Sequence, residues 1–112
     1  MDVVRRRRMG IGMQIVYLGF PGAARIEAAA AVELLRLERF SGAISGCHLA
    51  IEAMHSTTVT GTDYDARLDL VTRDGKLLPM PHCANADPEA AIRLAFDRAE
   101  QALLDPEACG KH

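Results

Sequence analysis

Apolar and polar residues alternate along two long stretches of this chain, which predicts two half-buried β-strands. In residues 43–54 one face is mainly apolar and the other is mixed (Cys47, Leu49, Ile51 and Ala53 against His48, Ala50, Glu52 and Met54). Residues 63–72 separate the two classes more sharply (Tyr64, Ala66, Leu68 and Leu70 against Asp63, Asp65, Arg67 and Asp69). We therefore expect a sheet with one dry face and one solvated face.

Two shorter strands complete the predicted sheet. Residues 13–18, MQIVYL, are rich in apolar and β-branched residues and are followed by Gly19 and Pro21. Residues 73–76, Arg-Asp-Gly-Lys, predict a hairpin turn, after which residues 77–82 should return antiparallel. Because prolines cannot donate to a hydrogen-bond ladder, Pro79 and Pro81 place this last strand at a sheet edge.

A helical repeat of apolar residues appears twice. In residues 23–40 it comprises Ile26, Ala30, Leu34 and Leu37, without a good N-cap residue before it. The second helix opens with Asp87 as cap, Pro88 in the first turn and Glu89 near the positive end of the dipole, and Asp105-Pro106 ends it. Its apolar stripe consists of Ile92, Ala95, Phe96, Ala99 and Leu103.

The predicted order is β-α-β-β-β-α, and the predicted fold class is α+β. Since each helix has one apolar stripe and the sheet one apolar face, both helices should pack on the same face of a four-stranded sheet. A chain of 112 residues supports one such domain. We expect residues 1–12 to be a disordered leader, 13–105 the domain and 106–112 a frayed tail.

The charge balance excludes a generally basic surface. The formal net charge is −2, with 49% hydrophobic and 25% charged residues. Residues 13–105 hold eight Lys or Arg and thirteen Asp or Glu, so their formal net charge is 8 − 13 = −5. The whole chain is less negative because it also contains Arg5 to Arg8. We expect those arginines to belong to the leader; a purposeful basic arm is the alternative. Any contact with RNA must therefore come from a local patch.

Three cysteines without paired spacing, and no long apolar segment for secretion or membrane insertion, predict a cytoplasmic protein without membrane contact. A zinc site is not expected. Cys47 with His48, and His82 with Cys83, are strand neighbours that point to opposite faces. Cys109 and His112 have no second pair to complete a tetrahedron. We predict no metal and no cofactor.

No pattern indicates an enzyme or a small-molecule substrate. Asp63, Asp65 and Asp69 lie on the expected wet face, where solvation explains them. Ser56 follows His55 directly, but sequence neighbours rarely form a relay and no orienting acid is evident. Gly10 and Gly12 lack the lysine and the strand-to-helix context of a phosphate loop.

Arginines are the more informative residues. On a helical wheel Arg25, Arg36 and Arg39 lie close together, on the side opposite the apolar stripe, and form an arginine ridge. The alternative is an ordinary solvated face that also holds Glu27, Glu33 and Glu38. The second helix adds Arg93 and Arg98, but Glu89 and Asp97 stand four residues from Arg93 and can pair with it.

Four stretches together resemble a known family: LRLERF (35–40), CHLAIEAMH (47–55), YDARLDLVTRDGKLL (64–78) and DPEAAIRLAFDRAEQALLD (87–105). In order and spacing they are similar to the ribosome hibernation promoting factors, the ribosome-associated translation inhibitors also called sigma modulation proteins. The likeness covers residues 13–105. Each motif alone is weak, and their joint order is what carries the resemblance.

The resemblance implies a bacterial, non-catalytic protein that binds rRNA of the small ribosomal subunit near the decoding channel and inhibits translation under stress. Arg36 and Arg39 match basic places in the family's helix-ending motif, Arg67 matches an arginine of its third strand, and Arg93 matches the arginine after Ala91-Ile92. These four are the expected RNA contacts, with Arg25, Arg98 and His55 as support.

This sequence also departs from the family. His55 is followed by Ser56, Thr57, Thr58 and Val59, where close relatives carry a basic run; LPMPH (78–82) replaces a stretch that commonly carries an arginine; Glu100 and Gln101 stand where arginines are common. Loss of several phosphate contacts lowers affinity steeply at physiological salt. Our second hypothesis is therefore a protein-interaction module that has lost ribosome binding and uses the wet sheet face or the edge at residues 77–82.

Overall fold

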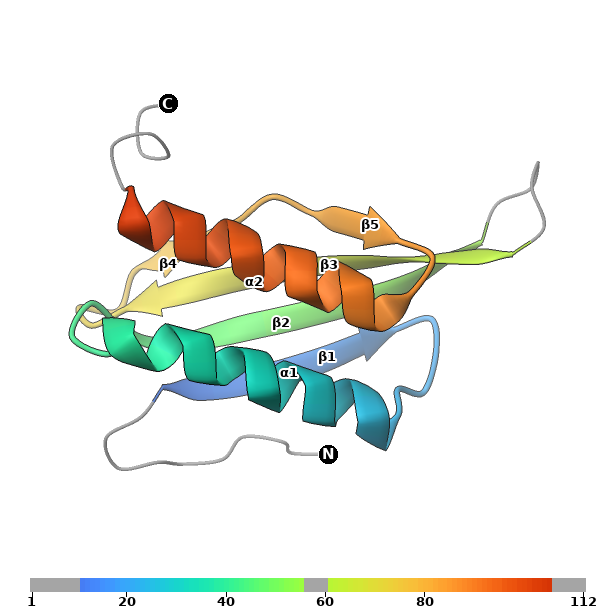
Figure 1. Cartoon of the computed structure of the whole chain (residues 1–112), viewed down its shortest axis with the longest axis horizontal. Helices are drawn as coiled ribbons and strands as arrows, with labels where there is room; N and C mark the ends of the chain where they lie inside the picture. Colours follow the sequence, from blue (N-terminus) through green and yellow to red (C-terminus); the bar gives the residue numbers. More distant parts are fainter. Residues whose placement is uncertain (1–10, 56–60, 106–112) are drawn as a thin grey trace.

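The computed structural model describes residues 11–55 and 61–105, which form a mixed sheet covered on one face by two helices (Figure 1). Along the chain the elements are β1 (Gly12–Leu18), α1 (Ala24–Leu37), the 3-10 turn η1 (Glu38–Phe40), β2 (Ile44–His55), β3 (Thr62–Thr72), β4 (Leu77–Leu78), β5 (Cys83–Asn85) and α2 (Pro88–Leu104). The α+β class and the β-α-β-β-β-α order are confirmed. Neither helix is long and apolar enough to cross a membrane, as far as the described residues show.

The sheet order is β1-β2-β3-β4, and β5 also pairs with β3. β1 runs parallel to β2, whereas β2–β3, β3–β4 and β3–β5 are antiparallel. Leu49 faces Ile15 on one side and Leu68 on the other, so that a continuous apolar surface crosses the three long strands. The parallel pair needs a crossover connection, and α1 supplies it.

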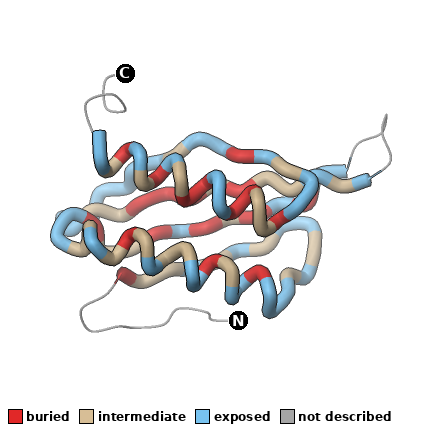
Figure 2. The backbone as a smooth tube through the Cα atoms, in the orientation of Figure 1, coloured by how far each residue is buried: buried red, intermediate tan, exposed pale blue. Residues whose placement is uncertain are grey.

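The core lies between this apolar surface and the helices, as the buried residues of Figure 2 show. The predicted inward residues of β2 are buried, as are those of β3 except the half-buried Tyr64. The stripes of both helices are buried except Leu34 and Leu103, which pack half-buried against the core. Ile11 and Gly12, which we expected in the leader, take part in the fold: Ile11 is buried in the core and Gly12 begins β1. Residues 1–10 and 106–112 lie outside the described residues.

Both predicted helix starts are observed. Ala23 precedes α1 without a side-chain cap, as expected from the sequence. At α2 the Asp87 carboxylate accepts a hydrogen bond from the Glu89 N–H at 3.2 Å, with Pro88 in the first turn. A carboxylate at this position satisfies one of the free N–H groups and complements the helix dipole.

The predicted strand at residues 77–82 is wrong in its extent. The turn forms as expected, closed by the Thr72 N–H to the Lys76 carbonyl with Gly75 at φ 89°. After it, however, only Leu77–Leu78 pair with β3, and pairing resumes at Cys83–Asn85. Pro79 and Pro81 have no N–H for the ladder, so the segment between the two short strands leaves the regular register.

We expected Asp69 to be solvated, but it is buried and only 7% exposed. Its Oδ1 accepts a hydrogen bond from the Met80 N–H at 3.0 Å. Met80 stands between the two prolines, where its N–H has no strand partner. The side chain of Asp69 therefore takes the place of the missing ladder bond and holds the irregular edge against β3.

Replacing Asp69 by Ala should lower the free energy of unfolding by about 1–3 kcal/mol, because the partly buried Met80 N–H loses its acceptor. Urea denaturation of the variant and of the wild type measures this difference. Asp63→Ala is the control, since Asp63 is an exposed residue of the same strand, and it should change stability by less than about 0.5 kcal/mol. Equal effects of the two substitutions would contradict the assigned role of Asp69.

Candidate nucleic-acid interface

The seven residues expected to contact RNA do not form one surface. Arg25, Arg36 and Arg39 lie on α1 and η1, and Arg93 and Arg98 lie on α2. Arg67 points to the opposite face of the sheet, and His55 ends β2 at the hairpin end that lies far from the C-terminal ends of both helices (Figure 1). The helical face therefore holds five of the seven.

The arginine ridge is not directed away from the core as the helical wheel suggested. α1 and α2 run side by side in the same direction (Figure 1), and the ridge lies on the flank of α1 that faces α2. The side chain of Arg36 is 33% exposed and forms ion pairs with acids of both helices. The helical wheel alone could not indicate this, because it contains no information about the neighbouring helix.

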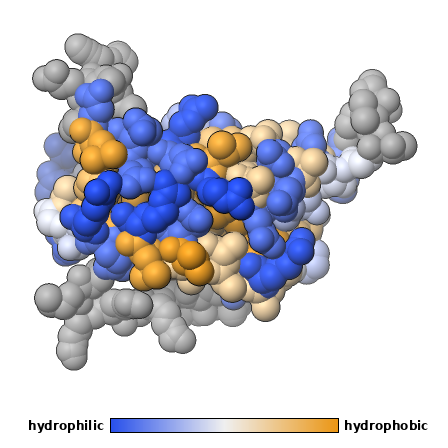
Figure 3. Space-filling view, in the orientation of Figure 1, coloured by the Kyte–Doolittle hydropathy of each residue, from blue (hydrophilic) through white to orange (hydrophobic). Residues whose placement is uncertain are grey.

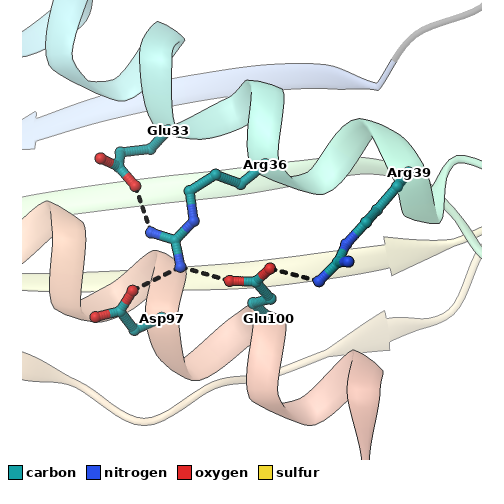
Figure 4. A network of polar contacts seen from close by, with 5 residues as sticks. All are labelled: Glu33, Arg36, Arg39, Asp97 and Glu100. Carbon is teal, nitrogen blue, oxygen red and sulfur yellow. Dashed lines mark hydrogen bonds and ion pairs between the residues drawn. The ribbon is translucent and has the colours of Figure 1, made fainter.

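Five residues form this ion-pair network, shown in Figure 4: Glu33, Arg36, Arg39, Asp97 and Glu100. Arg36 Nη1 donates to Glu33 Oε1 at 2.6 Å, while its Nη2 donates to Asp97 Oδ1 at 2.6 Å and to Glu100 Oε1 at 2.5 Å. Arg39 Nη2 donates to the other oxygen of Glu100 at 2.7 Å. Glu100 therefore bridges the two arginines.

The electrostatics follow from these contacts. Hydrogen bonds to Glu100, Glu33 and Asp97 raise the pKa of the Arg36 guanidinium further above its ordinary value. The hydrogen bond from Arg36, together with the charges of Arg36 and Arg39, holds the pKa of Glu100 below its ordinary value. Both residues stay ionised at neutral pH, so the ion pairs between α1 and α2 persist at that pH.

Arg25 and Arg39 are more exposed than Arg36. Arg25 Nε lies 3.4 Å from Glu89 Oε2, near the start of both helices. The side chain of Arg39 is 58% exposed, and its guanidinium lies 4.9 Å from the centre of the Phe40 ring. An isolated exposed pair such as Arg25–Glu89 contributes little to stability and exchanges partners readily.

The predicted pairing of Arg93 with Glu89 and Asp97 is wrong. Glu89 instead contacts Arg25, and Asp97 contacts Arg36. Arg93 and Arg98 are exposed and form no ion pair with any residue in the described ranges. Each acid pairs with an arginine of α1, although Arg93 stands about one helical turn from both. Arg93 and Arg98 are consequently the freest cations of the helical face.

Arg67 lies among acids on the outer face of the sheet. His82 Nδ1 is 2.5 Å from Asp65 Oδ2, and Arg67 Nη1 is 3.5 Å from His82 Nε2. Arg67 Nε lies 3.3 Å from Asp69 Oδ2 but forms no hydrogen bond with a described residue, so the contact is one of charge alone. Arg67 therefore belongs to a local polar cluster and not to the surface of the other arginines.

His55 is exposed, and its Nδ1 lies 3.2 Å from Thr62 Oγ1 across the hairpin. Residues 56–60, where the family's basic run is missing, lie outside the described residues. The structure thus places His55 at the end of β2, in the β2–β3 hairpin, and not on either helix.

Arg73 is a cation that our sequence interpretation assigned only to a turn. Its Nε donates to the Ser41 carbonyl at 2.8 Å, and its N–H bonds to the Ala43 carbonyl. These bonds hold the β3–β4 turn against the segment that follows η1, which places Arg73 at the same end of the molecule as Arg39. Only the antiparallel pairing of β2 with β3 brings the two segments together.

Two observations on the described residues concern metal and thiol chemistry. No three His, Cys, Asp or Glu side chains of residues 11–55 and 61–105 gather as metal ligands. Burial raises the pKa of Cys47 to about 12, so this thiol stays protonated at neutral pH. Burial also raises the pKa of Cys83. Neither cysteine is an activated nucleophile.

Solved structures share this fold. A ribosomal subunit interface protein from Coxiella burnetii superposes with a TM-score of 0.67 at 14% identity, covering 86% of this chain and 97% of that one. The N-terminal domain of Thermus thermophilus Protein Y superposes with a TM-score of 0.60 at 20% identity, covering 85% and 96%. Both have the fold of the hibernation and sigma modulation family, so the resemblance seen in the sequence is confirmed at the level of the fold. No protein-family model matches the sequence, and no curated protein matches it either.

Replacing Arg36 by Gln should lower the free energy of unfolding by about 1–3 kcal/mol, because three carboxylates then lose their shared counter-charge in a partly buried site. Urea denaturation at neutral pH measures the loss. Arg93→Gln is the matched control: it removes the same charge from an exposed arginine without an ion pair in the described part of the chain, and we expect a change within about 0.5 kcal/mol. A loss no larger than that of the control would show that the network does not stabilise the helix pair.

Acid should weaken the network. Because the folded-state pKa of Glu100 is lowered from 4.5, its contribution is complete above that value and is lost as pH falls through the lowered pKa. Wild type should therefore lose more stability between pH 7 and pH 3 than Glu100→Gln, measured by urea denaturation at each pH. Glu52→Gln, a substitution at an exposed residue of β2, should follow the wild type. Identical pH profiles for wild type and Glu100→Gln would contradict the assignment.

Proposed function

We propose that this protein is a non-catalytic, ribosome-associated factor of the cytoplasm that binds rRNA of the small subunit near the decoding channel and inhibits translation under stress. The observation that carries the proposal is the likeness of the whole fold to two proteins named for the ribosome or for Protein Y, over 97% and 96% of their chains. The ordered motifs of the sequence support it independently.

The helical face is the contact surface that we favour. It holds Arg93 and Arg98, which form no ion pair with a described residue, and the exposed Arg39. Guanidinium groups suit phosphate oxygens because they donate two parallel hydrogen bonds. Arg36 can bind a phosphate only if the phosphate replaces carboxylates that Arg36 now contacts. Arg25 lies at the other end of α1. Arg67 lies on the opposite face of the sheet and His55 at the end of β2, so we do not assign them to this surface.

A protein-interaction module is the second candidate, and exposed apolar side chains favour it. Val32 and Leu35 on α1 are 63% and 62% exposed, and Figure 3 shows hydrophobic atoms on this side of the molecule. On the outer face of the sheet Val16, Leu18 and Met54 are also exposed. An apolar interface of this kind would be insensitive to salt, whereas phosphate contacts weaken steeply as ionic strength rises.

Co-sedimentation with 30S and 70S particles at low and at physiological salt tests the proposal. Wild type should pellet with both particles at low salt and less completely at physiological salt. Arg93→Gln with Arg98→Gln should flatten the dependence of log K on log salt by about 1–2 units, because two phosphate contacts are lost.

The control removes two cations from other surfaces, by Arg67→Gln with Lys76→Gln. It changes the net charge equally and should leave binding close to the wild type. Equal losses in the two double variants would contradict a contact through the helical face. Absence of wild-type binding at low salt would reject ribosome association and favour the protein-interaction candidate.

A further inference from the structure

The ion-pair network has more negative than positive charge. Arg36 and Arg39 contribute two positive charges, while Glu33, Asp97 and Glu100 contribute three negative ones, so 2 − 3 gives −1. These two arginines are the ones that match the basic places of the family's helix-ending motif. With their present partners they offer an approaching phosphate no net attraction.

Three of the five N–H donors of Arg36 are occupied as well. Both of its terminal nitrogens already donate to carboxylates, at 2.5–2.6 Å. A phosphate that binds a guanidinium in the usual two-pronged way needs two of these N–H groups. Besides its contact with the Phe40 ring, Arg39 has one carboxylate partner among the described residues, from Nη2 to Glu100, and a phosphate can displace this single carboxylate more easily.

The acids from α2 lie only partly in solvent. The side chain of Glu100 is 20% exposed, whereas that of Asp97 is 48% exposed. A carboxylate that loses its arginine in a partly buried place must regain solvation, which costs free energy. Glu100, which contacts both arginines, therefore opposes their release most strongly.

We infer that Asp97 and Glu100 compete with RNA phosphates for Arg36 and Arg39. These two carboxylates of α2 thereby lower the affinity of the helical face for RNA. The inference rests on the proposed function, since it assigns a regulating contact to the same helical face. A phosphate gains Arg36 by displacing carboxylates, whereas Arg93 and Arg98 remain open to it. First contact then occurs at α2, and the arginines of α1 exchange afterwards.

The first experiment needs no ribosome. The side-chain Nε–Hε signals of the arginines are followed by NMR while inorganic tripolyphosphate is added. In the wild type the signals of Arg93 and Arg98 should shift most and that of Arg39 less, while that of Arg36 should stay nearly constant. In Asp97→Asn with Glu100→Gln, all four should shift. Equal responses of Arg36 and Arg39 in wild type and variant would overturn the competition, whatever the protein binds in the cell.

The second experiment measures binding of the same variant to 30S particles. Its dissociation constant should fall about tenfold at low salt, and its salt dependence should steepen by about 1–2 units, because two more arginines reach phosphate. Glu52→Gln with Asp63→Asn is the matched control, since it removes two exposed acids from the opposite face of the sheet and changes the net charge equally. An equal gain in the control, or weaker binding by the variant, would overturn the inference.

The two experiments distinguish failure of the proposed function from failure of the competition between carboxylates and phosphates. Arginine signals that respond as expected, with no 30S binding by any variant, would reject the proposed function and retain the competition. The single variant Glu100→Gln, checked by thermal unfolding, keeps the test valid if the double variant loosens the helix pair. It should show the larger part of both effects, because Glu100 contacts both arginines.

Discussion

Burial of the apolar sheet face under the two helices is the constraint on which the rest of this structure depends. The inward side chains of β2 and β3 include Leu49, Ile51, Leu68 and Leu70, all buried. Against them lie the stripes of both helices, with Phe96 of α2 as the largest fully buried side chain in the described part of the chain. Burial of side chains of this size stabilises by about 1.5–3 kcal/mol each. A sheet with one apolar face admits the helices on that face only, and it is wide enough for two of them side by side.

Side-by-side packing explains why the arginines of α1 are not free. With one flank of each helix turned toward its neighbour, polar residues of both flanks come within ion-pair distance, as in Arg36 with Glu100. The network is thus a consequence of the core packing, and it converts a basic segment of the sequence into a surface of nearly balanced charge. The number of arginines on a face therefore does not measure its attraction for phosphate.

The outer face of the sheet follows a different rule, because neither α1 nor α2 covers it. Its polar side chains contact one another or the irregular edge: Asp69 accepts the Met80 N–H, and Asp65 contacts His82. The first of these contacts supplies an acceptor for a backbone N–H in the interrupted last strand. Beside them lie exposed apolar residues such as Val16 and Leu18 on β1. This mixture suits contact with a protein better than contact with RNA, which is why the helical face is favoured for phosphate.

The sequence by itself determined the order of the elements, the inward faces and the capping of α2. These features depend on local periodicity and on residues such as Asp87 and Gly75, whose chemistry acts within a few positions along the chain. Tertiary structure alone decided where the last strand is interrupted, why Asp69 is buried and which acids hold Arg36. Met80 is eleven residues from Asp69, and Glu100 is sixty-four residues from Arg36. Charge pairs at such separations are set by helix packing and strand register, and neither is encoded in the spacing of neighbouring residues.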